Sequence, residues 1–287
     1  MRVFDKRYLD QLATVYDKKT VEGLNSKLAE KDHILLNHSG VVLPGKDTSR
    51  FQKDGFKESD LLYCLHDLEK DLVVFATKHI GKILSGGYIL DAGCGAGESA
   101  ILINKESGCK IDGYTLSEKQ KDFANHVAEE YGVSKTVKFY QGNMLNLENV
   151  SSHTFDVVWA CESTEHVSRK DLQVMFKEFS RVTIPKSKVV IIAWTSRAGL
   201  HKDGKRIKKA LDEYYLTDIH LEQDYIAAAR KEGWLATETL DLADMTLPYW
   251  ELRQKSNNAT GSEKIFIEGY KNDALSYILY VFGKRNN

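Results

Sequence analysis

The chain has 287 residues, of which 42% are hydrophobic and 28% charged, an ordinary globular composition with room for one large domain or a domain with an added cap. Its 40 Lys and Arg residues nearly cancel its 41 Asp and Glu residues, so no overall field favours nucleic acid or a membrane surface. The four cysteines lack C-x-x-C spacing, so we expect neither a disulfide framework nor a zinc site. The N-terminus lacks an apolar signal region and no apolar run approaches a membrane span, so we expect a soluble cytoplasmic protein without a membrane span.

The first 80 residues are predicted to form a helical segment. Residues 1–60 mix helix and loop, and apolar residues at helical spacing predict a helix over 61–80. Strands and helices then alternate, with strands predicted at 87–91, 109–114, 136–141, 155–161 and 187–195, and helices at 97–106, 117–131 and 170–182. This alternation predicts an α/β fold with a doubly wound, Rossmann-like parallel sheet that helices cover on both faces.

The pattern changes after Arg197. The basic stretch His201–Lys209 is predicted to be a loop, which leads to helices near 222–232 and 260–272, and the apolar run Ser276–Gly283 is predicted to return as an edge strand. We therefore expect two parts. One is an N-terminal helical lid segment of residues 1–80. The other is a domain of residues 81–287, whose insertion after the fifth strand, at about 197–272, covers the substrate.

A glycine-rich turn follows the first predicted strand. Asp91 ends the apolar run, and Gly93, Gly95 and Gly97 follow at alternate positions before a helix. Glycine tolerates positive φ and lets a ligand lie against the main chain, and the helix start offers free N–H groups. An ordinary glycine-rich turn is the competing interpretation of G-x-G alone, and a dinucleotide fingerprint reads G-x-G-x-x-G.

An acidic residue beside a pyrophosphate would be repulsive, whereas a ligand that carries an ammonium and a sulfonium group would attract Asp91. The turn resembles the first motif of class I S-adenosylmethionine (SAM) methyltransferases, and it predicts SAM as the cofactor, bound at Asp91, Gly93, Gly95 and Gly97. A Rossmann-like class I methyltransferase sheet is the fold that this resemblance implies.

The ends of the next two strands carry further candidate cofactor ligands. Thr115 and Gln120 follow the second strand and can hydrogen-bond ribose hydroxyls, while Ser117 is predicted to be a helix N-cap. After the third strand, Asn143 is a candidate for the adenine edge and Met144 for its face. A plain loop is the alternative for Asn143 and Met144. Suitable groups at three consecutive strand ends favour a cofactor site.

The fourth strand ends in the candidate catalytic residues Glu162, Glu165 and His166. A carboxylate against apolar walls is a candidate general base because burial raises its pKa toward the working pH. Glu162 directly follows the apolar strand and is the first candidate, and a structural acid that pairs with an arginine or a helix start is its alternative. Glu165 and His166 are expected to orient the site or to cap the next helix.

Aromatic residues are abundant in the segment expected to cover the substrate, namely Tyr214, Tyr215, Tyr249, Trp250 and Tyr270. Methylation of oxygen or nitrogen needs only a base, whereas methylation of an alkene carbon creates a cation that aromatic faces stabilise. Core packing is the alternative role for each ring.

The chain resembles the geranyl diphosphate 2-C-methyltransferase family and related prenyl diphosphate C-methyltransferases over roughly residues 35–280. Motifs shared with many methyltransferases are Asp91-Ala-Gly-Cys-Gly95, Thr115-Leu-Ser117, Asn143-Met-Leu145 and Glu162-Ser-Thr164. The more specific motifs, which bear on substrate class, are Leu247-Pro-Tyr-Trp-Glu-Leu-Arg253 and Thr260-Gly-Ser-Glu-Lys-Ile-Phe-Ile-Glu268.

The resemblance implies methylation of an alkene carbon in a prenyl diphosphate, with Glu162 as proton acceptor and the Tyr215 ring near the cation, where the geranyl enzyme has Phe. It also implies a diphosphate bound with Mg²⁺. Glu69 fits a metal role, joined by Asn37 or His38 in a segment that differs from the His-rich stretch of the geranyl enzyme.

Substrate contacts are expected from four residues of the covering segment, Tyr249, Trp250, Arg253 and Lys264, with a surface salt bridge as the alternative for Arg253 and Lys264. Geranyl and farnesyl diphosphate are the expected substrates, the latter with possible cyclisation, and isopentenyl diphosphate is a shorter candidate. A small-molecule N-, O- or lipid methyltransferase and a non-catalytic SAM-binding partner subunit are the alternative functions. A homo-oligomer is compatible with the sequence.

Overall fold

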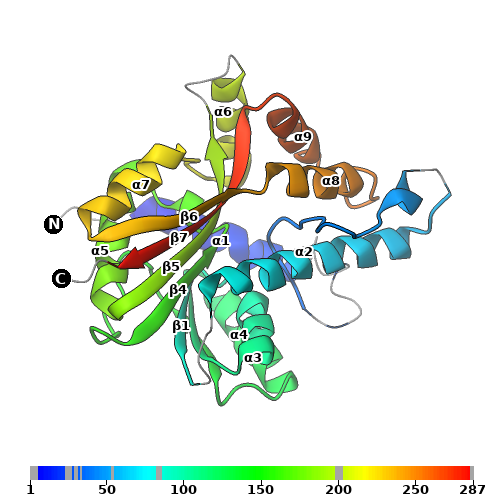
Figure 1. Ribbon diagram of the computed structural model, residues 1–287. Coiled ribbons are helices and arrows are strands. Elements are labelled where there is room, and N and C mark those ends of the chain that lie inside the picture. Colours follow the sequence, from blue (N-terminus) through cyan, green and yellow to red (C-terminus); the bar gives the residue numbers. More distant parts are fainter. Residues whose placement is uncertain are drawn as a thin grey trace.

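The computed structural model describes residues 6–22, 28, 32, 34–52, 55–81, 86–197 and 203–284. These residues form one seven-stranded sheet in the order β3-β2-β1-β4-β5-β7-β6 (Figure 1). The strands are β1 (Tyr88–Ala92), β2 (Lys110–Thr115), β3 (Val137–Gln141), β4 (Phe155–Cys161), β5 (Thr183–Ser196), β6 (Trp234–Asp241) and β7 (Leu275–Lys284).

The first five strands are parallel to one another, and β7 runs antiparallel to both β5 and β6. The strand order reverses at β1, because β2 and β3 lie on one side of it and β4 and β5 on the other. Doubly wound sheets bind ligands at such a point, at the carboxyl ends of their strands. The doubly wound arrangement predicted from the alternating pattern is confirmed.

The prediction of an edge strand at Ser276–Gly283 is wrong. This run lies in β7, which pairs with β5 on one side and with β6 on the other. The first eight residues of β7 are all buried, as in the interior strands of covered sheets. The edge position belongs to β6, a strand not predicted from the sequence.

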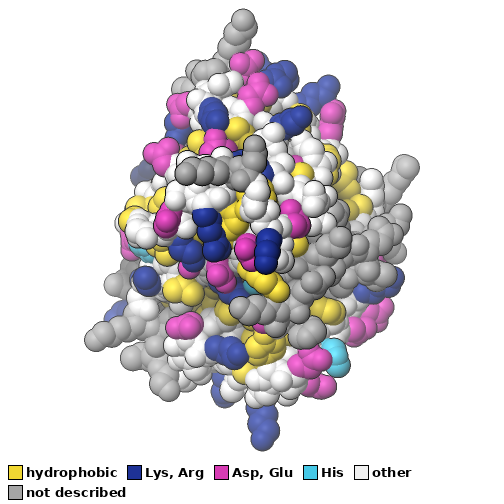
Figure 2. All heavy atoms as spheres, turned by 90° about the vertical axis from the view of Figure 1, so that its right-hand side faces the viewer, with side chains coloured by type: hydrophobic (Ala, Val, Ile, Leu, Met, Phe, Trp, Pro, Cys, Tyr) yellow, Lys and Arg dark blue, Asp and Glu magenta, His cyan; other side chains and the backbone are white. Residues whose placement is uncertain are grey.

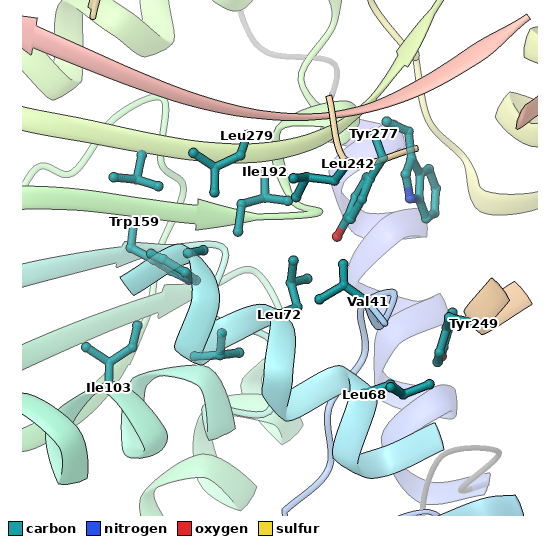
Figure 3. Packing of buried hydrophobic residues seen from close by; sticks show 14 of the residues in the cluster. Val41, Leu68, Leu72, Ile103, Trp159, Ile192, Leu242, Tyr249, Tyr277 and Leu279 are labelled. Atoms are coloured by element: carbon teal, nitrogen blue, oxygen red, sulfur yellow. The ribbon is translucent and has the colours of Figure 1, made fainter. Parts of the chain in front are cut away.

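Helices cover both faces of the sheet (Figure 1). Together with β-strand side chains, α2 (Glu58–Ile80), α3 (Glu98–Ser107) and α4 (Glu118–Glu130) build one core cluster, and α5 (Leu172–Val182) and α7 (Glu222–Lys231) build the other. Leu72 of α2 points toward Ile192 and Leu279 of the sheet (Figure 3). The remaining helices are α1 (Lys6–Glu22), α6 (Gly204–Tyr215), α8 (Ala243–Arg253) and α9 (Glu263–Lys271), with short 3₁₀ turns at Ser49–Phe51, Thr164–His166 and Arg169–Asp171.

The basic stretch predicted as a loop lies mostly in a helix. α6 begins at Gly204, and Ile207 and Leu211, one turn apart, are buried against the core. The basic side chains occupy its other faces, where Arg206 pairs with Glu268 of α9 and Lys209 with Glu213. Positions 201 and 202 lie outside the described residues.

The segment of about residues 197–272, which was expected to cover the substrate, does not form one continuous cover. Within it, α7 and β6 belong to the helical layer and to the sheet edge. Two separate pieces remain as candidate covers, α6 after β5 and the pair α8–α9 between β6 and β7.

Charge on the molecule is mixed. On the face that Figure 2 shows, acidic and basic side chains are interspersed, in agreement with the net charge of −1. All four cysteines are free. Among the described helices, none combines the length and the apolar character that crossing a membrane requires.

Candidate active site

The glycine turn after β1 has the conformation that its sequence predicts. Gly93, Gly95 and Gly97 have φ values of 86°, 55° and 92°, a region that favours glycine. A Cβ atom on Gly93 would lie 2.4 Å from the Cβ of Ser163, and one on Gly97 would lie 2.6 Å from the ring of Phe139. Gly93 therefore lets the turn pack closely against Ser163 after β4, and Gly97 lets α3 approach the sheet.

Two acidic side chains at this turn are buried without a neutralising partner. One oxygen of Asp91 and one of Glu98 have no hydrogen-bond partner among the described residues. Burial raises the pKa of Asp91 to about 7 and the pKa of Glu98 well above its ordinary value. A cationic ligand would restore the charge of these carboxylates, which is the electrostatic requirement of an ammonium or sulfonium group.

The ends of β2 and β3 come to the same cavity. The Thr115 hydroxyl donates to Oε1 of Gln120 at 2.7 Å, which leaves the buried Nε2 of Gln120 without a partner. Ser117 caps α4, as predicted, by accepting from the backbone N–H of Gln120. Asn143 and Met144 lie on the far wall. Of the predicted cofactor ligands, the structure brings all but Gly97 to this cavity.

Two adjoining cavities meet at the end of β4. The first lies over the glycine turn, and the second is lined by residues of α6 and α8. Five residues line both of them: Tyr16, Asn37, His38, Glu162 and His166. A group on this shared wall faces both occupants.

Glu162 is held firmly on the shared wall. Its Oε1 accepts from the backbone N–H of Ser39 at 2.7 Å and from the hydroxyl of Tyr277 at 2.8 Å. Its φ of 45° is rare for a residue with a side chain and marks strain of the kind found at functional sites. In the part of the chain that is described, no arginine pairs with Glu162, so the alternative of a structural ion pair finds no support.

Burial raises the pKa of Glu162, while nearby His38 and the hydrogen bonds from Ser39 and Tyr277 oppose that rise. The carboxylate therefore has the character of a general base: it is partly desolvated, yet it receives two hydrogen bonds that favour its charged form.

His166 and Glu165 stand next to Glu162 on the 3₁₀ turn. The imidazole of His166 makes a 2.7 Å hydrogen bond to the Tyr16 hydroxyl through Nε2 and a 3.0 Å bond to the backbone oxygen of Leu216 through Nδ1. These two hydrogen bonds connect α1 to the end of α6 through His166. The orienting role expected for His166 stays a prediction. Glu165 is buried, and its Oε1 accepts from the backbone N–H of Trp194 at 2.8 Å.

Aromatic rings form much of the second cavity. Tyr215, Tyr249 and Trp250 line it together with Trp194, whose ring centroid lies 5.1 Å from that of Tyr215. The hydroxyl of Tyr215 is bonded to Ser262 at 2.7 Å, which fixes the ring. Among the rings singled out in the sequence, Tyr270 packs in the core and does not line the cavity. Tyr214 lies at its edge and is 51% exposed.

Arg253 is the cation of the second cavity. It lies between two buried acids, 3.8 Å from Glu69 and 3.5 Å from Glu263, and it donates to the hydroxyl of Tyr249 at 3.1 Å. These neighbours raise its pKa against the effect of burial. The alternative of a surface salt bridge is wrong for Arg253. Lys264 is exposed and lines neither cavity.

Of the three residues proposed for a metal, the structure brings two to the cavities and leaves the third outside them. Asn37 and His38 line both cavities, but Glu69 lines neither of them. One oxygen of Glu69 accepts from the Tyr249 hydroxyl at 2.7 Å, and the other is buried without a hydrogen-bond partner. Among the described residues, no group of three or more His, Cys, Asp or Glu side chains could hold a metal.

Several residues of the site were not identified from the sequence. Tyr16, Ser39 and Tyr277 reach it from segments more than 100 positions away from Glu162, and no local pattern marks them. A signal did exist for two others: Glu98 opens the helix after the glycine turn, and Trp194 lies near the end of β5.

Comparison with known proteins agrees with this geometry. The sequence profile of a methyltransferase domain family matches residues 89–186, which span β1 to the start of β5. The sheet order, the glycine turn with its acid and the paired cavities define a class I SAM-dependent methyltransferase.

The particular family follows from whole-chain similarity. Geranyl diphosphate 2-C-methyltransferase from Saccharopolyspora erythraea is 33% identical, over 92% of this chain and 90% of that protein. The enzyme of the same name from Streptomyces lasalocidi is 30% identical, over 95% and 89%. The chain belongs to the geranyl diphosphate 2-C-methyltransferase family.

Solved structures extend the similarity to the fold. Geranyl diphosphate C-methyltransferase from Streptomyces coelicolor, in complex with Mg²⁺, geranyl-S-thiolodiphosphate and S-adenosyl-L-homocysteine, superposes with a TM-score of 0.88 at 27% identity, covering 97% of this chain and 98% of that one. A geranyl diphosphate methyltransferase in complex with geranyl diphosphate and sinefungin gives a TM-score of 0.88 at 28% identity, covering 97% and 100%.

Proposed function

We propose that this protein transfers the methyl group of SAM to an alkene carbon of a prenyl diphosphate, geranyl or farnesyl diphosphate, and that Glu162 accepts the proton lost from the resulting cation. The observation that carries the proposal is the meeting of two cavities at one wall, on which Glu162 stands. Support comes from the family membership and from the relatives solved with geranyl diphosphate or its thiolo analogue.

The first cavity fits SAM. Gly93 lets the turn lie close to Ser163 and Met144 of the cavity wall, and the free oxygens of Asp91 and Glu98 suit the cationic amino-acid end of SAM. The free Nε2 of Gln120 remains available to an acceptor on the ligand. When bound, SAM would supply an electrophilic methyl group, whose bond to sulfur breaks with its electron pair left on sulfur, so that S-adenosylhomocysteine is the leaving group.

The second cavity suits a substrate that becomes a cation. The electron pair of the alkene forms the new C–C bond, and a neighbouring carbon becomes cationic. The faces of Tyr215, Trp194 and Trp250 attract that charge without reacting with it. A C–H bond next to the cation then breaks, its electron pair forms the new C=C bond, and the proton passes to the Glu162 carboxylate. The hydrogen bonds from Ser39 and Tyr277 hold the carboxylate in place for this step.

The polar end of the second cavity suits the diphosphate. Arg253, on the cavity wall, supplies positive charge, and Thr260 beside it supplies a hydroxyl. When bound, Mg²⁺ neutralises part of the diphosphate charge. The amide oxygen of Asn37 is a suitable ligand on the shared wall, whereas the imidazole nitrogen of His38 is a poor one for this hard cation. The metal role of Glu69 stays a prediction.

The test is an assay of wild-type protein with labelled SAM, Mg²⁺ and, separately, isopentenyl, geranyl and farnesyl diphosphate, with the products identified by mass spectrometry. The proposal expects one added methyl carbon on geranyl or farnesyl diphosphate, in linear or cyclised form, and loss of product when a chelator removes Mg²⁺. Failure to methylate any of these diphosphates would contradict it. Methylation of nitrogen or oxygen in another small molecule would indicate the broader methyltransferase alternative, and SAM binding without any turnover would indicate a non-catalytic subunit.

A further inference from the structure

A second carboxyl group faces the substrate cavity, and the mechanism above does not use it. Glu165 is only 1% exposed and lines the same cavity as Glu162. Its Oε1 accepts a single hydrogen bond, from the backbone N–H of Trp194 at 2.8 Å. Its Oε2 is buried and has no hydrogen-bond partner among the described residues. An ionised carboxylate with a bare buried oxygen is costly.

The two glutamates differ in what stabilises their charge. Glu162 receives hydrogen bonds from Ser39 and Tyr277, whereas Glu165 receives one. No lysine or arginine of the described segments forms an ion pair with either of them. Two carboxylates that line the same cavity repel each other when both are ionised, so one proton belongs to the pair. Of the two, Glu165 is the poorer place for a negative charge.

We propose that Glu165 stays protonated throughout the reaction and thereby leaves Glu162 as the single carboxylate that faces the substrate cation. The inference rests on the proposed function. Glu165 acts as a positioning residue: it exchanges no proton with the substrate, and the proton released from the cation goes to Glu162 alone.

A neutral Glu165 has two consequences for a cationic intermediate. The cavity can admit an anionic diphosphate with only one negative carboxylate on its wall. In addition, the cation meets one base instead of two, so that its proton is removed from one side and a single alkene is favoured. Enzymes with paired acids use the same principle: the surroundings of the two groups differ, so that one is protonated while the other is ionised.

The surroundings of Glu165 agree with a neutral carboxyl. Burial first, and the charge of Glu162 second, raise its pKa to about 8, while interactions with the backbone N–H groups of Trp194 and of Glu165 itself and with the Thr164 side chain oppose that rise. The charge of Glu165 raises the pKa values of five weak acids on the elements around it: Tyr16 on α1, Cys161 on β4, Tyr225 on α7, Tyr270 on α9 and Tyr280 on β7. His166 is its chain neighbour, and Arg253 and Tyr215 line the same cavity.

The pH profile of methyl transfer tests the proposal. Above about pH 8, Glu165 ionises in the wild-type protein, whereas Glu165→Gln keeps a neutral side chain at every pH. We expect the ratio of kcat/KM at about pH 9 to that at about pH 7 to be about tenfold lower for wild type than for Glu165→Gln, because one pH unit above a pKa leaves about a tenth of the group protonated. The exposed, ion-paired Glu213 on α6 is the control, and Glu213→Gln is expected to keep the wild-type ratio.

A spectroscopic readout separates this inference from the proposed function. Infrared difference spectra of wild type and Glu165→Gln at neutral pH should show the C=O stretch of a protonated carboxyl that is lost in the variant, whatever the substrate proves to be. Absence of that band, or the same pH ratio in wild type and variant, would overturn the inference. A failure of wild type to methylate any prenyl diphosphate, with the band present, would instead count against the proposed function alone.

Discussion

The position of Glu162 follows from its local sequence, whereas its hydrogen-bond partners depend on the whole fold. An acid directly after the apolar strand β4 predicts a carboxylate at the carboxyl end of a buried strand, and the structure places it there. The hydrogen bonds to its carboxylate come from Ser39, 123 positions earlier, and from Tyr277, 115 positions later, and its proposed function as a base would depend on both. The residue type was predictable, but the hydrogen bonds that hold its charge were not.

Gly93 is a residue whose replacement should damage the cofactor site directly. We expect Gly93→Ala to abolish measurable SAM binding in isothermal titration calorimetry, because its Cβ atom would lie 2.4 Å from Ser163 in addition to adopting an unfavourable φ. Gly108 is a matched control: its φ is also positive, at 69°, but no atom lies within 4 Å of an added Cβ. Gly108→Ala should lower the free energy of unfolding by about 1–2 kcal/mol and keep SAM affinity. Equal SAM affinity in both variants would contradict the assignment of Gly93 to the cofactor site.

Asp91 should make SAM binding depend on pH. Burial raises its pKa to about 7, so it takes up a proton below that pH in the free protein, whereas a cationic ligand requires its charged form. Because bound ligand must then displace a proton, we expect SAM affinity to fall by about tenfold for each unit below about pH 7, and to level off above it. Calorimetry over that range is the measurement. Asp91→Asn should bind more weakly with a flat profile. A wild-type profile without this slope would show that Asp91 does not face the cation.

At the level of elements, α8 connects α2 and the segment before it to α9. Its Arg253 lies between Glu69 of α2 and Glu263 of α9, and its Thr246 donates to the backbone oxygen of Gly40. No helix was predicted over α8, which contains Pro248, a residue unusual in a helix interior. Its specific motif nevertheless pointed to substrate contacts, and the structure brings Tyr249, Trp250 and Arg253 to the second cavity.

Arg253 should therefore matter for stability as well as for substrate binding. We expect Arg253→Met to lower the free energy of unfolding by about 3–5 kcal/mol, because it leaves the buried Glu69 and Glu263 without their shared cation. The exposed Arg206–Glu268 pair between α6 and α9 is the control, and Arg206→Met should cost at most about 1 kcal/mol. Urea denaturation measures both. Similar losses in the two variants would mean that Arg253 is not the centre of a buried network.

At the scale of the whole molecule, the alternating pattern was enough to predict the parallel part of the sheet but not its antiparallel edge. The strand β6 is mostly exposed, as expected of an edge strand, and no strand was predicted there. β7 was placed at the edge because it is last in the chain, although its run of eight buried residues is typical of an interior strand.

The candidate site was predictable where a motif is local. The glycine turn, Glu162 and the specific motif of α8 all came to the two cavities. Glu69 and Lys264 did not, because the sequence gives a residue's charge but not the direction in which its side chain points. The covering helix α1, which brings Tyr16 to the shared wall, carries no such motif at all.

The most direct test of the account is single-turnover methyl transfer by wild type and Glu162→Gln, with labelled SAM, Mg²⁺ and whichever prenyl diphosphate the wild-type protein methylates. Loss of a positioned base should slow product formation by about 10²–10⁴-fold. SAM affinity, measured by calorimetry, should stay near the wild-type value, because Glu162 acts on the substrate. Unchanged product formation by Glu162→Gln would contradict the assignment of Glu162 as the proton acceptor.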